Sequence, residues 1–196
     1  MAQRDFITIV SGLPRSGTSM MMQALEAGGM PVLTDHVRTS DDDNPKGYYE
    51  FEPVKRTKQD PSWVPNARGK VVKVIYSLLY DLPQNFEYRV IFLERELDEV
   101  LASQKKMLQR RGQKGAGVDD AKMKELFRAQ LVKFNHWIRN QKCFRMLPVQ
   151  YAAMITDPLK TAEKINQFLG GGLDVQAMAA AVDPTLYRNK TNNCFY

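Results

Sequence analysis

The chain has 196 residues, a formal net charge of +6 and two cysteines. A chain of this length is expected to form one domain that buries roughly two thirds of its unfolded surface. Cys143 and Cys194 lie far apart in the sequence, which argues against a disulfide scaffold or a zinc site and fits a reducing compartment. The charged start MAQRDF and the lack of an apolar run of about 20 residues argue against a signal peptide and a membrane span, so we expect a soluble cytoplasmic protein.

The first predicted elements are a strand, a turn and a helix. Phe6 to Val10 is apolar and β-branched, which is typical of a buried parallel strand. Gly12 and Gly17 bracket the turn, and Ser16 to Ser19 supply hydroxyls and backbone donors where the helix begins. A helix start favours an anion through its unpaired N–H groups and its macrodipole, and Arg15 adds a cation. This layout predicts a phosphate-binding loop; the alternative is a turn that only caps the helix.

A polar stretch from residue 34 to residue 69 follows without clear periodicity. A segment of this length inside a compact domain is usually a functional loop or lid. Within it, Asn44 to Gly47 indicates a turn and Glu52-Pro53 predicts a short helix. Beyond it, Lys70 to Ile75 and Arg89 to Leu93 have the continuous apolar character of a second and a third buried strand.

Helices are predicted next. One begins at Leu97 and carries an apolar face as far as Leu108, where the basic, glycine-rich segment Gln109 to Gly117 interrupts it. Asp119 and Asp120 are good starts for a longer helix, whose apolar residues recur at helical spacing. These residues are Met123, Leu126, Phe127, Leu131, Phe134, Trp137 and Ile138.

The last elements are a strand and two helices. Phe144 to Tyr151 is predicted to be a fourth strand, in which Pro148 indicates an edge position or a strand end. Asp157 is a predicted N-cap followed by proline, and this helix stops at Gly170. An alanine-rich helix near Val175 to Val182 precedes an irregular, basic tail.

Strands that alternate with helices predict a parallel sheet with helices on both faces. The expected fold class is therefore α/β, with three layers around a central parallel sheet and a P-loop-like nucleotide-binding topology. We expect a single domain over residues 1–196.

A second predicted anion site follows the third strand. Ligands of parallel α/β sheets collect at the carboxyl ends of the strands. There, Arg95 offers a guanidinium fork, and Ser103 offers a hydroxyl from the next helix. Two anion sites at one sheet edge suit a ligand with phosphate at both ends.

Four segments resemble sulfotransferases. PRSGTSM at Pro14–Met20 is similar to their 5′-phosphosulfate loop, and LERELDEVLAS at Leu93–Ser103 is similar to their 3′-phosphate motif. NPKGYYE at Asn44–Glu50 and the run from Val149 to Gly170 resemble the bacterial, stand-alone branch. The resemblance implies 3′-phosphoadenosine 5′-phosphosulfate (PAPS) as donor, 3′,5′-bisphosphoadenosine as product, and no required metal.

The resemblance also implies a set of donor-binding residues. These are Pro14, Arg15, Ser16, Gly17, Thr18, Ser19, Arg95, Ser103 and, in place of an absent C-terminal Gly-rich Lys motif, Arg188. Arg15 stands where cytosolic steroid- and phenol-sulfating enzymes usually carry Lys, and Met20 stands where they carry Trp. These departures leave the donor intact and the acceptor open among small molecules, carbohydrates and lipids. The resemblance makes residues 34–69 the expected acceptor-side loop or lid.

The catalytic group is left among several candidates. Arg15 would neutralise the leaving oxygen, and the general base would be Glu50 or His36, both in the long loop. Lys73 is a charge within an apolar strand, so it either extends to solvent at an edge or points into the cleft as a site residue.

Two other functions remain open. Gly12 to Ser19 has the glycine spacing of a P-loop kinase or NTPase, but Thr18 occupies the position of the required Lys. A non-catalytic nucleotide- or nucleic-acid-binding domain is the other alternative. The basic segment at Lys105 to Lys114 lacks the interleaved aromatic residues that stack on bases, which disfavours nucleic acid.

Overall fold

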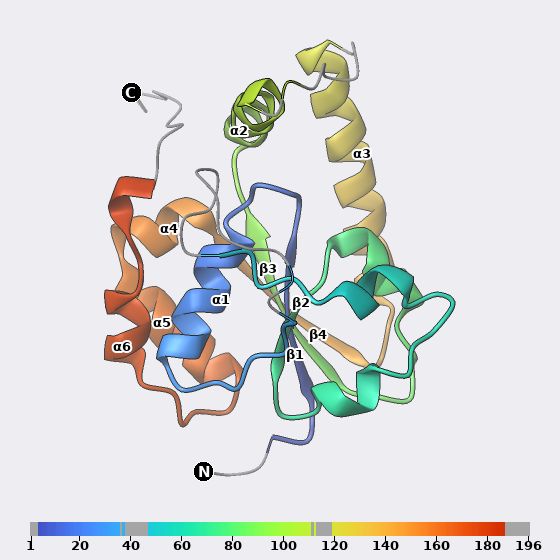
Figure 1. Ribbon diagram of the computed structural model, residues 1–196, viewed down its shortest axis with the longest axis vertical. Helices are drawn as coiled ribbons and strands as arrows, with labels where there is room; N and C mark the ends of the chain where they lie inside the picture. Colours follow the sequence, from blue (N-terminus) through green and yellow to red (C-terminus); the bar gives the residue numbers. More distant parts are fainter. Residues whose placement is uncertain (1–3, 36, 38–46, 111, 113–118, 187–196) are drawn as a thin grey trace.

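A central parallel sheet organises the chain in the computed structural model, which describes residues 4–35, 37, 47–110, 112 and 119–186 (Figure 1). The described strands pair in the order β2-β1-β3-β4, and all pairs are parallel. Their bounds are β1 Ile7–Gly12, β2 Val71–Lys73, β3 Tyr88–Glu94 and β4 Phe144–Gln150. Every residue of β1 is buried, because helices or loops cover both faces of this strand.

The register of the sheet aligns the strand ends. Gly12 pairs with Leu93 across β1 and β3, and Glu94 pairs with Gln150 across β3 and β4. Val10 pairs with Lys73, the last residue of β2. The segments that follow these strands therefore leave the sheet at the same edge, as parallel strands require.

Helices form the two outer layers, which confirms the predicted three-layer α/β class (Figure 1). One face is covered by helices from both ends of the chain: α1 (Thr18–Ala27), α4 (Tyr151–Thr156), α5 (Pro158–Phe168) and α6 (Val175–Ala180). The other face is covered by α3 (Asp120–Arg139) and the short 3₁₀ helices η1 (Glu52–Arg56), η2 (Val64–Ala67) and η3 (Tyr76–Asp81). Helix α2 (Leu97–Arg110) lies beyond the carboxyl edge of the strands, and η4 (Pro184–Leu186) ends the described chain.

Several predicted boundaries shift. The second strand ends at Lys73 rather than Ile75, and the fourth ends at Gln150, because Tyr151 begins α4 instead of closing a strand. Pro148 fits within β4, since this strand lies at the end of the strand order and its outer edge has no described neighbour. The alanine-rich helix ends at Ala180.

The structure confirms one of the two predicted N-caps and the short helix predicted in the long loop. The Asp157 carboxylate accepts a hydrogen bond from the Lys160 N–H at 3.2 Å, which confirms the N-cap of α5. Asp119 occupies the N-cap position of α3 but makes no side-chain capping bond. The short helix predicted at Glu52-Pro53 is η1. Most of the predicted glycine-rich segment and of the 34–46 stretch lies outside the described residues.

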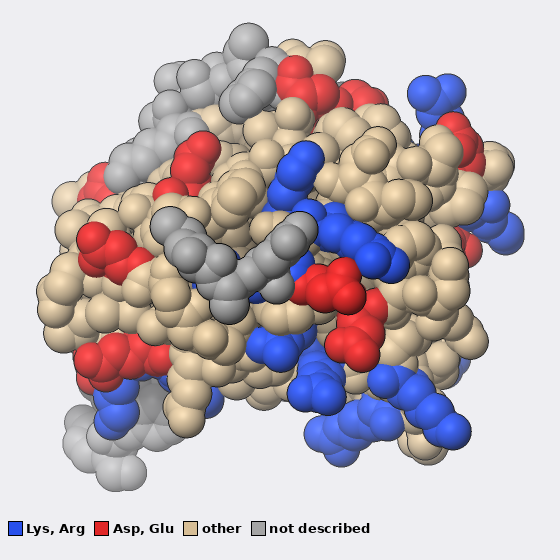
Figure 2. Space-filling view, turned by 90° about the horizontal axis from the view of Figure 1, so that it is seen from below, with Lys and Arg blue, Asp and Glu red and all other residues tan. Residues whose placement is uncertain are grey.

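Basic side chains also gather at the end of the molecule opposite the carboxyl edge of the sheet. Figure 2, which views the molecule from the side where the described chain begins, shows Lys and Arg beside a few acidic groups. Here Arg4 donates to the Leu169 carbonyl at 3.3 Å, and Arg89 donates to the Phe168 carbonyl at 2.6 Å. Burial lowers the pKa of both guanidinium groups. These arginines stabilise the carboxyl end of α5, so the net charge alone does not locate a ligand.

The apolar stripe of α3 is only partly in the core. Phe134 and Ile138 are buried, whereas Leu126 is 46% exposed. The first half of the helix extends beyond the sheet edge (Figure 1). Phe134 stacks on Phe92 of β3 at a centroid distance of 5.1 Å and meets Tyr76 edge-on at 5.6 Å. Among the described helices, none is long and apolar enough to cross a membrane.

We expect Phe134→Ala to lower the free energy of unfolding by about 3–5 kcal/mol, because it removes a fully buried ring and leaves a cavity. Leu126→Ala is the matched control on the same helix and should change it by less than about 1 kcal/mol. Urea unfolding followed by circular dichroism measures both. Equal losses for the two variants would contradict the assigned core.

Candidate functional site: an anion-binding loop at the sheet edge

The loop after β1 has an unusual backbone. Arg15 has φ 72° and Gly17 has φ 97°, so two residues around Ser16 adopt the left-handed region. Alternation of this kind turns successive N–H groups towards one side and forms an anion-binding concavity. For Arg15 the conformation costs about 1–2 kcal/mol. Strain of this kind concentrates at ligand sites.

The start of α1 adds further donors to this loop. Gly17 occupies the N-cap position and has no side chain, so no side-chain bond caps the first turn of the helix. The N–H groups of that turn are the donors that a helix offers to an anion. The Ser16 N–H is already used, because it bonds the Leu13 carbonyl at 3.2 Å.

The two predicted glycines are required by close contacts. A Cβ at Gly12 would lie 2.5 Å from Ser16 Oγ and 2.7 Å from the Leu93 carbonyl oxygen. A Cβ at Gly17 would lie 2.4 Å from Cδ2 of Tyr151. The loop therefore packs directly against the ends of β3 and β4, and no larger residue fits without displacing them.

Arg95 contacts the segments that follow three strands, β1, β3 and β4. Its Nε donates to Glu99 Oε2 at 2.9 Å, one turn further along the chain, and its Nη1 donates to the Arg15 carbonyl at 3.1 Å. Its guanidinium carbon lies 4.2 Å from the centroid of the Tyr151 ring. The side chains of Arg95 and Glu99 are only 8% and 3% exposed. The pair is therefore desolvated, and removal of one partner would leave a buried charge.

Arg15 and Ser103 are in direct contact. The Arg15 Nε donates to Ser103 Oγ at 3.0 Å. Sequence reasoning placed these two residues in separate anion sites, whereas the structure brings them and Arg95 into one continuous cluster. A ligand with two phosphates would contact both parts at once.

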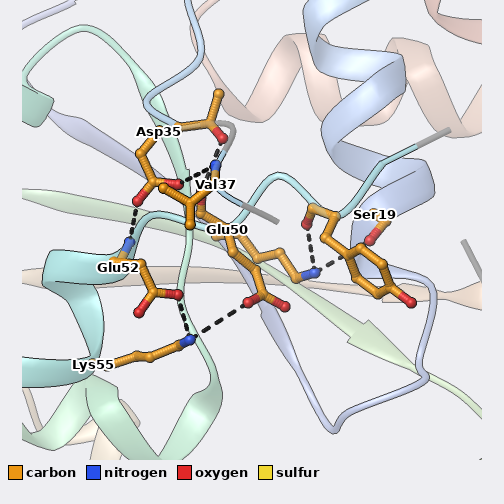
Figure 3. A network of polar contacts seen from close by, with 9 residues as sticks. Ser19, Asp35, Val37, Glu50, Glu52 and Lys55 are labelled. Atoms are coloured by element: carbon orange, nitrogen blue, oxygen red, sulfur yellow. Dashed lines mark hydrogen bonds and ion pairs between the residues drawn. The ribbon is translucent and has the colours of Figure 1, made fainter. Parts of the chain in front are cut away.

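Lys73 points towards the same loop from the other side. Its ammonium donates to the Tyr48 carbonyl at 2.8 Å and to Ser19 Oγ at 3.2 Å (Figure 3). Ser19 lies in the first turn of α1. Lys73 ends the edge strand β2, and its ammonium bonds protein atoms beside the loop; its role as a site residue stays a prediction.

Glu50 lies in the polar network that includes Ser19 (Figure 3). Its carbonyl accepts from Thr34 Oγ1 at 2.8 Å, and its carboxylate lies 3.7 Å from the ammonium of Lys55. The Glu50 side chain is 22% exposed, so it remains accessible to a ligand. Two other predicted site residues, His36 and Arg188, lie outside the described residues.

Sequence reasoning missed two residues of this site. Tyr151 was expected at a strand end, but it packs against Gly17 and beneath Arg95. Burial raises the pKa of its phenol, while the nearby Arg95 opposes that shift. The sequence could have indicated Tyr151 through its position at the end of the fourth predicted strand, at the same sheet edge as Arg95. Glu99 was missed although its spacing of four from Arg95 on a predicted helix indicates contact.

Metal ligands are not assembled in the described part of the chain. There, no group of three or more His, Cys, Asp or Glu side chains is arranged to hold a metal ion. The cations Arg15, Lys73 and Arg95 contact or belong to the loop, and the carboxylate of Glu99 pairs with Arg95. Cations gathered at one loop favour an anionic ligand.

Several solved structures with a similar fold are sulfotransferases. The chain aligns with the sulfotransferase domain of the Synechococcus PCC 7002 olefin synthase at a TM-score of 0.59 and 18% identity, over 100% of this chain and 91% of that one. It aligns with mouse sulfotransferase SULT7A1, solved in complex with PAP, at 0.59 and 20%, over 91% of this chain and 64% of that one. For sulfotransferase STF1 from Mycobacterium tuberculosis H37Rv the values are 0.57 and 17%, over 94% and 73%.

These likenesses define the fold. The arrangement of the parallel sheet, the loop after β1 and the surrounding helices is the P-loop-containing α/β fold that those sulfotransferases share. No protein-family model matches the sequence, and no curated protein matches it. The activity must therefore be argued from the residues at the sheet edge.

Gly17→Ala should destabilise the chain more than Gly29→Ala. Both glycines have positive φ values, 97° and 87°, so alanine costs about 1–2 kcal/mol at either position. Only Gly17 faces a ring that the new methyl group would meet, which adds about 1–3 kcal/mol of overpacking. Urea unfolding of the two variants measures the difference. Equal stabilities would show that the loop and Tyr151 are not in contact.

Proposed function

We propose that the protein is a sulfotransferase that moves a sulfuryl group from PAPS to a hydroxyl or amine of a small-molecule acceptor. The observation that carries the proposal is the continuous cluster of Arg15, Ser103 and Arg95, which joins the loop after β1 to the segment after β3. A nucleoside with a group at the 5′ position and a phosphate at the 3′ position matches two adjoining anion sites. The fold likeness supports this assignment.

The donor-binding roles follow from position. In the proposed complex, the amides of residues 17–19 with the Ser16, Thr18 and Ser19 hydroxyls hold the 5′-phosphosulfate. Arg95 and Ser103 hold the 3′-phosphate, and Arg188 remains a proposed additional contact. The buried hydroxyl of Ser16, which has no hydrogen-bond partner among the described residues, fits an anionic group. PAPS supplies an activated sulfuryl group.

The catalytic roles involve charge and one proton. As the acceptor oxygen bonds to sulfur, the bond from sulfur to the 5′-phosphate oxygen breaks, and the electron pair stays on that oxygen. Arg15 and Lys73 stabilise the charge that develops there. Glu50 takes the proton that the acceptor hydroxyl loses. Because a sulfuryl group carries less negative charge than a phosphoryl group, these cations suffice without Mg²⁺ in this proposal.

The domain assignment belongs to the same proposal. Residues 1–196 form one sulfotransferase-like domain, and residues 34–69 contribute the acceptor side. Glu50 and the buried Tyr48 belong to this segment, and the contact from Lys73 to the Tyr48 carbonyl connects it to the donor loop.

Ligand binding tests the donor assignment. We expect 3′,5′-bisphosphoadenosine in EDTA to raise the melting temperature, by about 5–10 °C at 100 times its Kd. ATP with Mg²⁺ should have little effect, and the reverse preference would support the kinase alternative instead. Arg15→Ala or Ser103→Ala should weaken binding about 10- to 100-fold, since each removes a hydrogen bond to a charged group. Arg68→Ala, an exposed arginine paired with Asp5, is the control.

Arg95→Ala is a poorer probe of binding. Its loss would leave Glu99 buried and unpaired, so the variant would lose stability as well as affinity. Retained affinity in both Arg15→Ala and Ser103→Ala would contradict the residue roles.

The rate of turnover tests whether Glu50 is the general base. Glu50→Gln should lower kcat about 10²- to 10⁴-fold and leave the affinity for 3′,5′-bisphosphoadenosine unchanged, because the amide cannot accept the proton. Glu52→Gln is the matched control, since both carboxylates contact Lys55. Transfer of labelled sulfate from PAPS to a panel of phenols, alcohols and amines measures both. Full activity of Glu50→Gln would exclude this base, and a wild-type protein without product for any acceptor would favour the binding-only alternative.

A further inference from the structure

The segment that ends in Glu50 has a strained backbone. Among the described residues, only Arg15 and Tyr49 combine a side chain with a positive φ, which is 72° and 53° respectively. An aromatic residue rarely adopts this left-handed region, because its Cβ comes too close to the following carbonyl oxygen. Gly47, two residues earlier, has φ 91°. The chain therefore turns sharply on both sides of Tyr48, immediately before the proposed base.

The phenol of Tyr49 is bonded to helix α1. Its hydroxyl donates to Glu26 Oε2 at 2.5 Å, and Glu26 lies in the last turn of this helix. The Tyr49 ring also packs against the core cluster that contains Met21 and Leu25 of α1. Burial and the Glu26 carboxylate raise the pKa of the phenol, so the hydroxyl keeps its proton and remains a donor at neutral pH. A hydrogen bond to an ionised acceptor is stronger than one between neutral groups.

The residue before Tyr49 is connected to the other end of the same helix. The Tyr48 carbonyl accepts from the Lys73 ammonium, which also donates to Ser19 Oγ in the first turn of α1 (Figure 3). Ser19 is one of the residues proposed to bind the donor. Tyr48 and Tyr49 thus connect their segment to both ends of α1, the helix that begins at the donor loop.

Glu50 is the next residue along the chain. Consecutive Cα atoms are only about 3.8 Å apart, so the bond from Tyr49 to α1 limits how far the Glu50 backbone can move from this helix. The direction of Glu50 also depends on Tyr49, because a change of the Tyr49 φ from positive to negative rotates the chain that follows. The conformation of Tyr49 therefore decides where the Glu50 carboxylate points.

We propose that Tyr49 is a positioning residue that holds Glu50 beside the donor loop through its bond to Glu26. The inference rests on the proposed sulfotransferase function and adds a residue that does not touch the reacting groups. The bond stabilises the left-handed backbone, and this backbone directs the carboxylate that takes the acceptor proton. Without the bond the segment relaxes towards negative φ, so only a fraction of the molecules keeps Glu50 in place.

Tyr49→Phe tests this role, because it removes the hydroxyl and keeps the ring. We expect it to lower kcat for sulfate transfer from PAPS about 10- to 100-fold, in proportion to the molecules that keep Glu50 in place. The affinity for 3′,5′-bisphosphoadenosine should stay within about twofold of wild type, since the change affects the base and not the donor site.

Variants of Glu26 test whether the effect passes through this bond. Glu26→Ala should lower kcat as much as Tyr49→Phe does, whereas Glu26→Gln, which keeps an oxygen acceptor, should stay within about threefold of wild type. The double variant Tyr49→Phe/Glu26→Ala should lose no more than either single variant, because both remove the same interaction.

Tyr88→Phe is the matched control. The Tyr88 hydroxyl donates to the Pro83 carbonyl at 2.7 Å, at the amino end of β3, so this variant loses a tyrosine hydrogen bond at the other edge of the sheet and should keep the wild-type kcat. Backbone chemical shifts of residue 49, measured by NMR with 3′,5′-bisphosphoadenosine bound, give a readout besides activity. They should indicate a positive φ in the wild type, Tyr88→Phe and Glu26→Gln, and a partly negative φ in Tyr49→Phe and Glu26→Ala.

The outcomes separate this inference from the proposed function. Wild-type kcat in Tyr49→Phe would overturn the positioning role and leave the proposed function in place. Loss of activity with an unchanged positive φ at residue 49, or an equal loss in Tyr88→Phe, would overturn the role as well. A wild-type protein that forms no product with any acceptor would instead contradict the proposed function, and the role of Tyr49 in the reaction would fall with it.

Discussion

The site depends on the way Arg95 is held. Its guanidinium lies at the end of β3, fixed by the Glu99 carboxylate, the Arg15 carbonyl and the face of the Tyr151 ring. These partners come from α2, the loop after β1 and the start of α4. One buried cation thus joins the segments that follow three neighbouring strands. Because its charge is already compensated by Glu99, the cluster can persist in the absence of ligand and remain ordered for binding.

The strained loop depends on this arrangement. Arg15 keeps a left-handed conformation that an isolated chain would rarely adopt. Its carbonyl accepts from Arg95, and its guanidinium reaches Ser103, so contacts at both ends of the residue hold it. Lys73 meets the same loop from β2 through Ser19. The result is a preorganised concentration of positive charge and N–H donors, which is what transfer of an anionic group requires.

Sequence reasoning predicted the features that depend on local pattern. The apolar runs gave the strands, and parallel pairing implied that the segments after Gly12 and Leu93 meet at one edge, which the register confirms. It could not predict contacts that depend on side-chain packing between distant segments. The bond from Arg15 to Ser103 and the place of Tyr151 beneath Arg95 are of this kind.

The remaining differences between the sequence predictions and the structure also depend on packing between distant segments. The spacing of apolar residues in α3 predicts a helix face but does not show that its first half passes beyond the sheet. The direction of Lys73 was an open alternative, because a strand lysine has the same sequence pattern whether it faces solvent or a ligand.

A crystal structure with 3′,5′-bisphosphoadenosine tests the central claim most directly. The account predicts that the 5′-phosphate binds the amides of residues 17–19 and that the 3′-phosphate binds Arg95 and Ser103, with the Arg95–Glu99 pair intact. A nucleotide bound away from this edge, or with its 3′-phosphate in solvent, would contradict it.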